Sequence, residues 1–168
     1  MSLPRKSTRN GTRGYAHLIE IEVPVARVWR ALTEPGLIRI WSGQEAEIDP
    51  RQGGAYRIGK RSTSREAHID IFEVNRRLRL IYLNGEDAPP SDSAAVDDFI
   101  LDARKGQTKT SLRLLGSGIP DAPAWDQAYT RIRLGWERFL ARIKVTLESP
   151  PAPKAITVKD PPLPGLDY

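Results

Sequence analysis

Near its C-terminal end the chain carries one long run of large apolar side chains at helical spacing. The side chains recur every three or four residues, with Phe139 widening the stripe, and this predicts an amphipathic helix of roughly residues 124–148. They are Trp125, Tyr129, Ile132, Trp136, Leu140, Ile143 and Leu147. A helix cannot leave so long a stripe in water, so the rest of the chain must supply a surface that covers it.

The segment before this helix is built mainly from short strand-like runs separated by turn sequences. The runs lie near 15–23, 44–49, 54–60, 65–74, 77–83, 95–104 and 108–117. Successive strands joined by short turns indicate an antiparallel meander rather than a doubly wound sheet. Only the C-terminal helix is long enough to cover the apolar face of this sheet. The sequence therefore predicts an α+β fold.

Two short helices follow the first strand, in the stretch "VPVARVWRALTEPGLIRIW". Pro24 suits the first turn of a helix that ends near Thr33, and a second helix covers about 35–41. Helices of this length are unstable alone in water, so packing must hold both. We expect Trp29 to anchor the pair against the body, and Trp41 to reach the space that a curled sheet leaves beside the long helix.

Several of these segments together resemble one family. They are "VPVARVWRALTEPGLIRIW", "DPRQGGAYRI", "RRL", "GSGIPD" and "GWERFLARIKVTLE", in the family's order and spacing over about 17–148. The chain resembles single-domain proteins similar to the activator of the 90-kDa heat-shock-protein ATPase, within the START-like helix-grip superfamily. It departs from the usual pattern at "IWSG", where relatives often carry paired tryptophans, and at Gly116, where a histidine is common.

The resemblance implies a curved seven-stranded antiparallel sheet wrapped around the C-terminal helix, with a cavity between them. Members of the superfamily bind lipids, sterols, polyketides or other small apolar molecules in that cavity. Large or polar side chains on the elements around it are the candidate ligand-binding residues. They are Trp41, Tyr56, Ile58, His68, Asp70, Phe72, Tyr82, Phe99, Trp125, Tyr129, Ile132 and Trp136.

The run 65–74 leaves its inward face undecided. His68 and Asp70 share one face with Phe72, and Ala67 and Ile69 share the other. If Phe72 points at the helix, His68 and Asp70 enter the cavity and could bind a ligand or supply acid–base chemistry. The interpretation we favour places them on the outer, solvated face.

Gly135 and Trp136 in the long helix raise a second choice. A glycine inside a helix costs about 1 kcal/mol relative to alanine, so something must compensate for it. One explanation is close approach of the helix to the sheet, with the indole of Trp136 buried beside it. The other is a place in the cavity wall, and the first is the one we favour.

Composition excludes several classes of function. The chain has no cysteine and two histidines, so we expect no metal site and no disulfide, and a reducing, cytoplasmic location. No phosphate-binding or dinucleotide-binding motif is present, so we expect no cofactor, and no apolar run is long enough for a membrane span. The net charge of +5 comes mainly from Arg5, Lys6, Arg9 and Arg13, which argues against a nucleic-acid platform on the body.

These patterns divide the chain into three parts. Residues 1–14 are expected to form a disordered basic arm, 15–148 the helix-grip domain, and 149–168 an extended proline-rich tail. Within the domain, we expect the loops 59–64, 84–94 and 116–124 to frame the mouth of the cavity, with Trp125 at its rim.

Three functions remain open from the sequence. The leading one is binding of a small apolar ligand in the cavity, without assigned catalytic residues. The second is an interaction module whose partner is a chaperone or a second copy of the chain. The third is an enzyme of the cyclase or aromatase kind, which requires His68 or Asp70 inside the cavity.

Overall fold

A computed structural model describes residues 11–60, 65–83 and 93–150, and in these ranges it confirms the α+β fold. The strands are β1 (Thr12–Ile21), β2 (Ala46–Ile48), β3 (Ala55–Ile58), β4 (Glu66–Glu73), β5 (Arg77–Tyr82), β6 (Val96–Arg104) and β7 (Lys109–Pro120). The helices are α1 (Val25–Thr33), α2 (Pro35–Ser42), the short 3-10 helix η1 (Pro123–Trp125) and α3 (Asp126–Glu148). None of the described helices combines the length and apolarity needed to cross a membrane.

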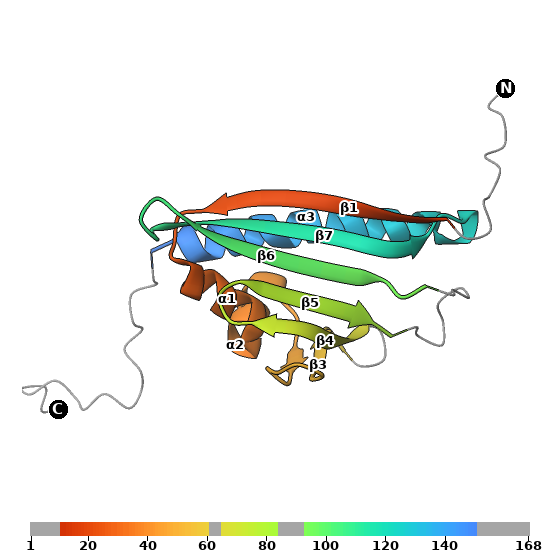
Figure 1. The fold of residues 1–168 in the computed structure, drawn as a ribbon, viewed down its shortest axis with the longest axis horizontal. Helices are drawn as coiled ribbons and strands as arrows, with labels where there is room; N and C mark the ends of the chain where they lie inside the picture. Colours follow the sequence, from red (N-terminus) through yellow and green to blue (C-terminus); the bar gives the residue numbers. More distant parts are fainter. Residues whose placement is uncertain (1–10, 61–64, 84–92, 151–168) are drawn as a thin grey trace, which may run out of the picture.

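The strands form one antiparallel sheet in the order β1-β7-β6-β5-β4-β3-β2 (Figure 1). Strands β2 to β7 are paired consecutively, which confirms the predicted meander, and β1 returns to pair with β7. The first and last strands are thereby joined, because β1 and β7 are paired over most of their length. The sheet is open, with β1 at one edge and β2 at the other.

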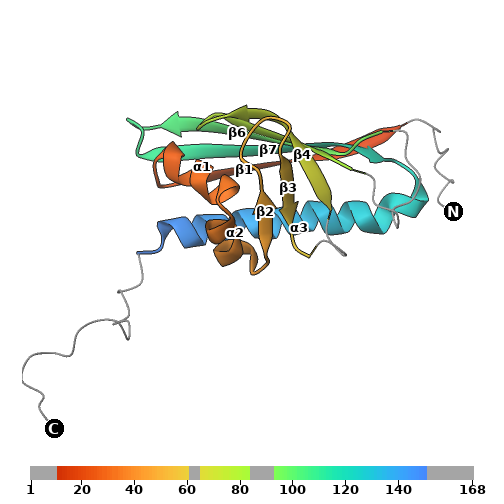
Figure 2. The same ribbon diagram turned by 90° about the horizontal axis from the view of Figure 1, so that it is seen from below.

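Helix α3 runs along one face of this sheet, as the apolar stripe predicts (Figure 2). Its buried residues are Trp136, Leu140, Ile143 and Leu147. They belong to one apolar core with the inward side chains of the central strands, which include Leu78, Leu80, Phe99, Leu112 and Leu114. Each such side chain contributes about 1.5–3 kcal/mol by leaving water, so this stripe is the main contact that holds helix to sheet.

The short helices α1 and α2 are fastened to each other and to the sheet by side-chain hydrogen bonds. The indole Nε1 of Trp41 donates to the backbone oxygen of Ala31 at 2.8 Å, which ties α2 to α1. The hydroxyl of Tyr56 on β3 donates to the backbone oxygen of Leu32 at 2.7 Å. Trp29 packs edge-on against Phe72 of β4, with ring centres 5.1 Å apart. Tertiary contacts therefore stabilise both short helices, as expected.

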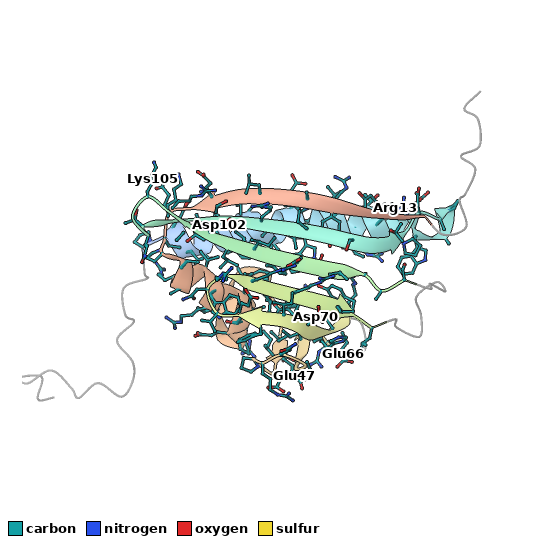
Figure 3. All side chains as sticks on the ribbon, in the orientation of Figure 1. Arg13, Glu47, Glu66, Asp70, Asp102 and Lys105 are labelled. Atoms are coloured by element: carbon teal, nitrogen blue, oxygen red, sulfur yellow. The ribbon has the colours of Figure 1, made fainter. Side chains whose placement is uncertain are left out.

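The face of the sheet turned away from α3 carries ion pairs between neighbouring strands. Arg77 donates two hydrogen bonds to Asp98, of 3.0 and 2.6 Å, from β5 to β6. Asp70 lies 3.7 Å from Arg79 and belongs to this same outer layer, where Figure 3 shows it on β4. One face of the sheet is thus apolar and covered, and the other is polar and open to solvent, as is common for antiparallel sheets.

Some boundaries differ from the prediction. Strand β1 begins at Thr12, so the expected disordered arm of residues 1–14 overlaps its first three residues. The first two of these, Thr12 and Arg13, pair with the end of β7. Residues 1–10 and the expected proline-rich tail from 151 onward lie outside the described residues. The two loops expected at the cavity mouth, 59–64 and 84–94, are also only partly within the described ranges.

Candidate ligand-binding site

A cavity of ≈ 420 Å³ lies between the sheet and α3. Its apolar and aromatic wall comes from β3, β5 and α3, and its polar groups come from both sides of the sheet–helix gap. The lining residues are Gln44, Tyr56, Ile58, Arg65, Tyr82, Arg131, Ile132, Gly135, Trp136 and Phe139. The size and the mixture of aromatic walls with a few polar groups are typical of small-molecule sites.

Five of the expected ligand-binding residues line this cavity. They are Tyr56, Ile58, Tyr82, Ile132 and Trp136. The two tyrosine hydroxyls point away from a ligand, because each is donated to a protein acceptor. What these residues present to the cavity is therefore mainly ring surface and aliphatic surface.

The other apolar candidates do not line the cavity. Phe99 is fully buried behind Trp136, with ring centres 5.2 Å apart. Trp41, expected to reach the cavity, is instead buried behind Phe139 and uses its N–H to join α1 and α2. Phe72 is half-buried and packs against Trp29, on the inward face of β4.

Trp125 and Tyr129 lie near the start of α3, beyond the cavity wall. The hydroxyl of Tyr129 donates to the backbone oxygen of Gly14 at 2.7 Å, and the Arg13 guanidinium lies 4.5 Å from the centre of its ring. Tyr129 therefore fastens the start of α3 to β1. Within the described part of the chain, the buried indole nitrogen of Trp125 meets no acceptor.

His68 and Asp70 lie on the outer face of β4, because Ala67 and Ile69 are the buried residues of this strand. A bulge between Ile69 and Ile71 shifts the register against β5. In a regular strand, residues three apart point to opposite faces. The extra residue of the bulge lets Phe72 point inward like Ile69, three positions earlier. The assumption that Phe72, His68 and Asp70 share one face is therefore wrong, and the cyclase or aromatase hypothesis loses its acid–base pair.

Gly135 opens onto the cavity instead of bringing α3 close to the sheet. A Cβ built on Gly135 would meet no atom within 4 Å, although the residue lies inside the helix and lines the cavity. The close-approach explanation for this glycine is therefore wrong. The absence of a side chain at Gly135 leaves cavity volume that any other residue would reduce.

A buried carboxylate lies behind the cavity wall and was not among the expected site residues. Asp97 of β6 is 1% exposed and accepts hydrogen bonds from the hydroxyls of Tyr15 and Tyr82 and from the Trp136 indole, the last two at 2.7 and 2.9 Å. Tyr82 and Trp136 are also cavity residues. Asp97 thus fixes the orientation of two walls of the cavity from behind.

Gly116 makes this arrangement possible. Tyr15 of β1 pairs with Gly116 of β7, and Gly116 pairs on its other side with Asp97 of β6. A Cβ at Gly116 would clash with the ring of Tyr15, so the ring lies directly over the glycine. The tyrosine can therefore cross β7 and place its hydroxyl on Asp97, two strands away. The glycine that departs from the family pattern is explained by this contact.

Burial controls the protonation of this cluster. It raises the pKa of the Asp97 carboxyl, while the charge of Arg65 and the three donated hydrogen bonds oppose the rise. Burial also raises the pKa of the Tyr15 and Tyr82 hydroxyls, and the negative charge of Asp97 raises each pKa further. Both tyrosines therefore remain protonated donors at neutral pH.

Arg65 is a charged group beside this cluster on the cavity side. It begins the segment that leads into β4, and its guanidinium carbon lies 3.6 Å from the centre of the Tyr82 ring. Its positive charge lowers the pKa of Asp97, against the effect of burial. Arg65 also lines the cavity, so it connects the buried carboxylate with the space where a ligand would lie.

Among the described lining residues there is no carboxylate, histidine, serine, threonine or lysine, and both tyrosine hydroxyls are already donated within the protein. Both oxygens of Asp97 also accept hydrogen bonds from side chains of the chain itself. These groups can hold, orient and desolvate a molecule.

The sequence carried a signal for part of what was missed. Asp97, Phe99 and Leu101 alternate along β6, so the carboxylate had to share the inward face of the two apolar residues. Arg65, Arg131 and Gln44 gave no such signal, because charged and amide residues in these positions are usually solvated.

The protein has an antiparallel sheet, a long helix packed along one face of it, and a cavity between the two. This arrangement places it in the START-like helix-grip class. The sequence profile of the family described as "Activator of Hsp90 ATPase homolog 1-like protein" matches residues 22–148. The chain belongs to this family, which confirms the resemblance seen in the sequence. No curated protein matches the sequence.

Solved structures with the same fold include protein MLL2253 from Mesorhizobium loti, which is 26% identical with a TM-score of 0.67 over 79% of this chain and 94% of that one. An HSP90 activator from Plasmodium falciparum is 21% identical, with a TM-score of 0.68 over 82% of this chain and 97% of that one. The Aha1 dimer from Colwellia psychrerythraea is 17% identical, with a TM-score of 0.65 over 81% of this chain and 96% of that one. At these last two identities the likeness shows the fold alone.

Proposed function

We propose that this protein binds a small, largely apolar molecule in the cavity between the sheet and α3. The observation that carries the proposal is Gly135. This residue lines the cavity, and a side chain at its position would project into open space. A glycine inside a helix costs about 1 kcal/mol relative to alanine, and here no close packing compensates for it. The glycine keeps the cavity volume open, and this is the role we assign to a residue that otherwise destabilises the helix.

The walls of the cavity are also held in place before a ligand arrives. Tyr56 is fixed by its bond to Leu32, and Tyr82 and Trp136 are fixed by their bonds to Asp97. A site whose walls are already ordered loses little conformational entropy on binding, and this favours affinity. The rings provide apolar contact area, while Gln44, Arg65 and Arg131 offer polar contacts to one part of the ligand.

Native mass spectrometry of freshly purified protein, followed by a thermal-shift screen of apolar ligands, tests the proposal. A ligand at 100 times its Kd stabilises the folded state by about 2.7 kcal/mol, which is a readily measured shift. We expect Gly135→Leu, which puts a large side chain into the cavity, to abolish the shift that a wild-type ligand produces.

The matched control is Gly36→Leu. Gly36 also lies in a helix with no atom within 4 Å of a built Cβ, but it is exposed and does not line the cavity. We expect this variant to keep full binding. A ligand that shifts wild type and Gly135→Leu equally, or a screen in which no ligand shifts the wild type, would contradict the proposal.

The family match favours a second candidate, a chaperone-partner function. In that case a surface of the protein, and not its cavity, would contact a heat-shock ATPase. The measurement is the ATPase rate of a purified Hsp90 with and without this protein. Stimulation that persists in Gly135→Leu would support the second candidate, and an unchanged rate would exclude it for that chaperone.

A further inference from the structure

The polar part of the cavity wall carries positive charge. Arg65 and Arg131 approach the cavity from the sheet and from α3, and the remaining polar side chain, Gln44, is neutral. Among the lining residues that the structure describes, no carboxylate balances the two guanidinium groups. A guanidinium offers five N–H donors in a planar fork that matches a carboxylate.

The buried Asp97 does not fill this role. Both of its oxygens accept hydrogen bonds from Tyr15, Tyr82 and Trp136, and it lies behind the wall that two of those residues form. Arg65 is near enough to lower the pKa of Asp97, yet no ion pair joins the two groups among the described contacts. Asp97 therefore compensates part of the charge of Arg65 at a distance. The Tyr15 hydroxyl takes one hydrogen bond from Arg65, and a guanidinium with five N–H donors keeps others for a further acceptor.

Arg131 has even fewer partners. It is exposed on α3, and within the described part of the chain no ion pair or hydrogen bond involves its side chain. Other cations on or beside α3 are paired, as Lys144 is with Glu148 and Arg13 is with Asp126. An uncompensated arginine at a cavity that also holds Arg65 is a favourable position for an anion.

The rest of the wall is largely apolar. Ile58, Ile132 and Phe139 line it together with the rings of Tyr56 and Trp136. A ligand that satisfies both parts needs an apolar body and a negatively charged end. We propose that the cavity binds amphipathic organic anions, with a carboxylate-type group at Arg65 and Arg131 and the body against the apolar wall. The inference rests on the proposed function, and it adds the charge of the ligand.

Matched pairs of probes test the charge requirement by calorimetry at neutral pH. One pair is decanoate with decanol, and the other is naphthoate with naphthamide, so that aliphatic and aromatic anions are distinguished. We expect the anion of at least one pair to bind about tenfold tighter than its neutral partner, the effect of one charge-assisted hydrogen bond.

Arginine variants then locate the charge. Arg65→Gln and Arg131→Gln should each weaken binding of that anion by about threefold to tenfold and leave the neutral partner unchanged. The neutral probe also reports whether a variant still folds with an intact cavity. The matched control is Arg142→Gln, which makes the same change at an exposed position of α3. Arg142 lies about 16 Å along the helix from Arg131, which exceeds the screening length at physiological salt.

The outcomes separate the two claims. Equal binding of anion and neutral partner would overturn the charge requirement and leave the proposed function standing. No binding of any probe or screened ligand to wild type would overturn both. If an anion binds tighter but Arg65→Gln and Arg131→Gln weaken it no more than Arg142→Gln does, the assignment of these two arginines is wrong.

Discussion

The ring of Tyr15 on β1 lies over Gly116 on β7, in the space that a side chain at position 116 would occupy. From there the tyrosine hydroxyl reaches Asp97 on β6, the strand beyond. Three strands are thus connected through one polar contact in an otherwise apolar core. The contact matters for the cavity because Asp97 also holds Tyr82 and Trp136 in its wall.

Gly116→Ala should therefore destabilise the protein by about 1–3 kcal/mol, because overpacking displaces the Tyr15 ring and breaks its bond to Asp97. Urea denaturation measures the change in the free energy of unfolding. In the background of Tyr15→Ala, which removes the ring, the same substitution should cost clearly less. Equal costs in the two backgrounds would show that the ring does not cause the effect.

The pH dependence of stability should carry the signature of Asp97. Its pKa is raised in the folded state above the ordinary value of 3.8, mainly by burial. Between these two values the folded state binds more protons than the unfolded state, so stability decreases as the pH rises through this window. The contribution is complete below pH 3.8 and is lost above the folded-state pKa.

Comparison with Asp97→Asn isolates this contribution, since the asparagine does not titrate. Groups whose pKa is lowered, such as Glu20, Glu34 and Glu148, remain in both proteins and cancel in the difference. Urea denaturation of both proteins from acidic to neutral pH should show the advantage of wild type over the variant shrinking as the pH rises. Parallel profiles, or a growing advantage, would contradict the raised pKa.

Gly135→Ala should stabilise the folded protein by up to about 1 kcal/mol, because alanine is the better helix former and its Cβ meets no atom. The same methyl group reduces the cavity, so any ligand of wild type should bind more weakly. Thermal denaturation and ligand titration of one variant thus report two opposite effects. A loss of stability would contradict the open space beside Gly135.

Trp41→Phe should destabilise the protein by about 1 kcal/mol beyond the loss of ring area, since it removes the hydrogen bond to Ala31 that joins α1 and α2. Trp125→Phe is the matched control, because the indole nitrogen of Trp125 has no acceptor within the described chain. We expect the control to be nearly neutral in urea denaturation. Similar losses for both variants would show that the hydrogen bond of Trp41 contributes little.

The main elements of the fold could be predicted from the sequence because each carries its own local pattern. The stripe from Trp125 to Leu147 predicts α3, and the interruption at Pro35 predicts two helices where one periodic run would suggest a single helix. The candidate site was only partly predictable. Tyr82 and Trp136 were found because large rings on inward positions line most cavities of this kind, whereas Arg65 and Arg131 look like ordinary surface residues.

Sequence periodicity alone determined the α+β class, the order of the elements and the face that α3 buries. Two local decisions needed the tertiary structure. The bulge after Ile69 decided that His68 and Asp70 face solvent, because one extra residue reverses which side chains point inward. The open space beside Gly135 shows that this glycine lines a cavity. The sequence could not show this, because the helical spacing is the same whether a position packs against a neighbour or faces an empty volume. Such distinctions depend on distances between segments far apart in the chain.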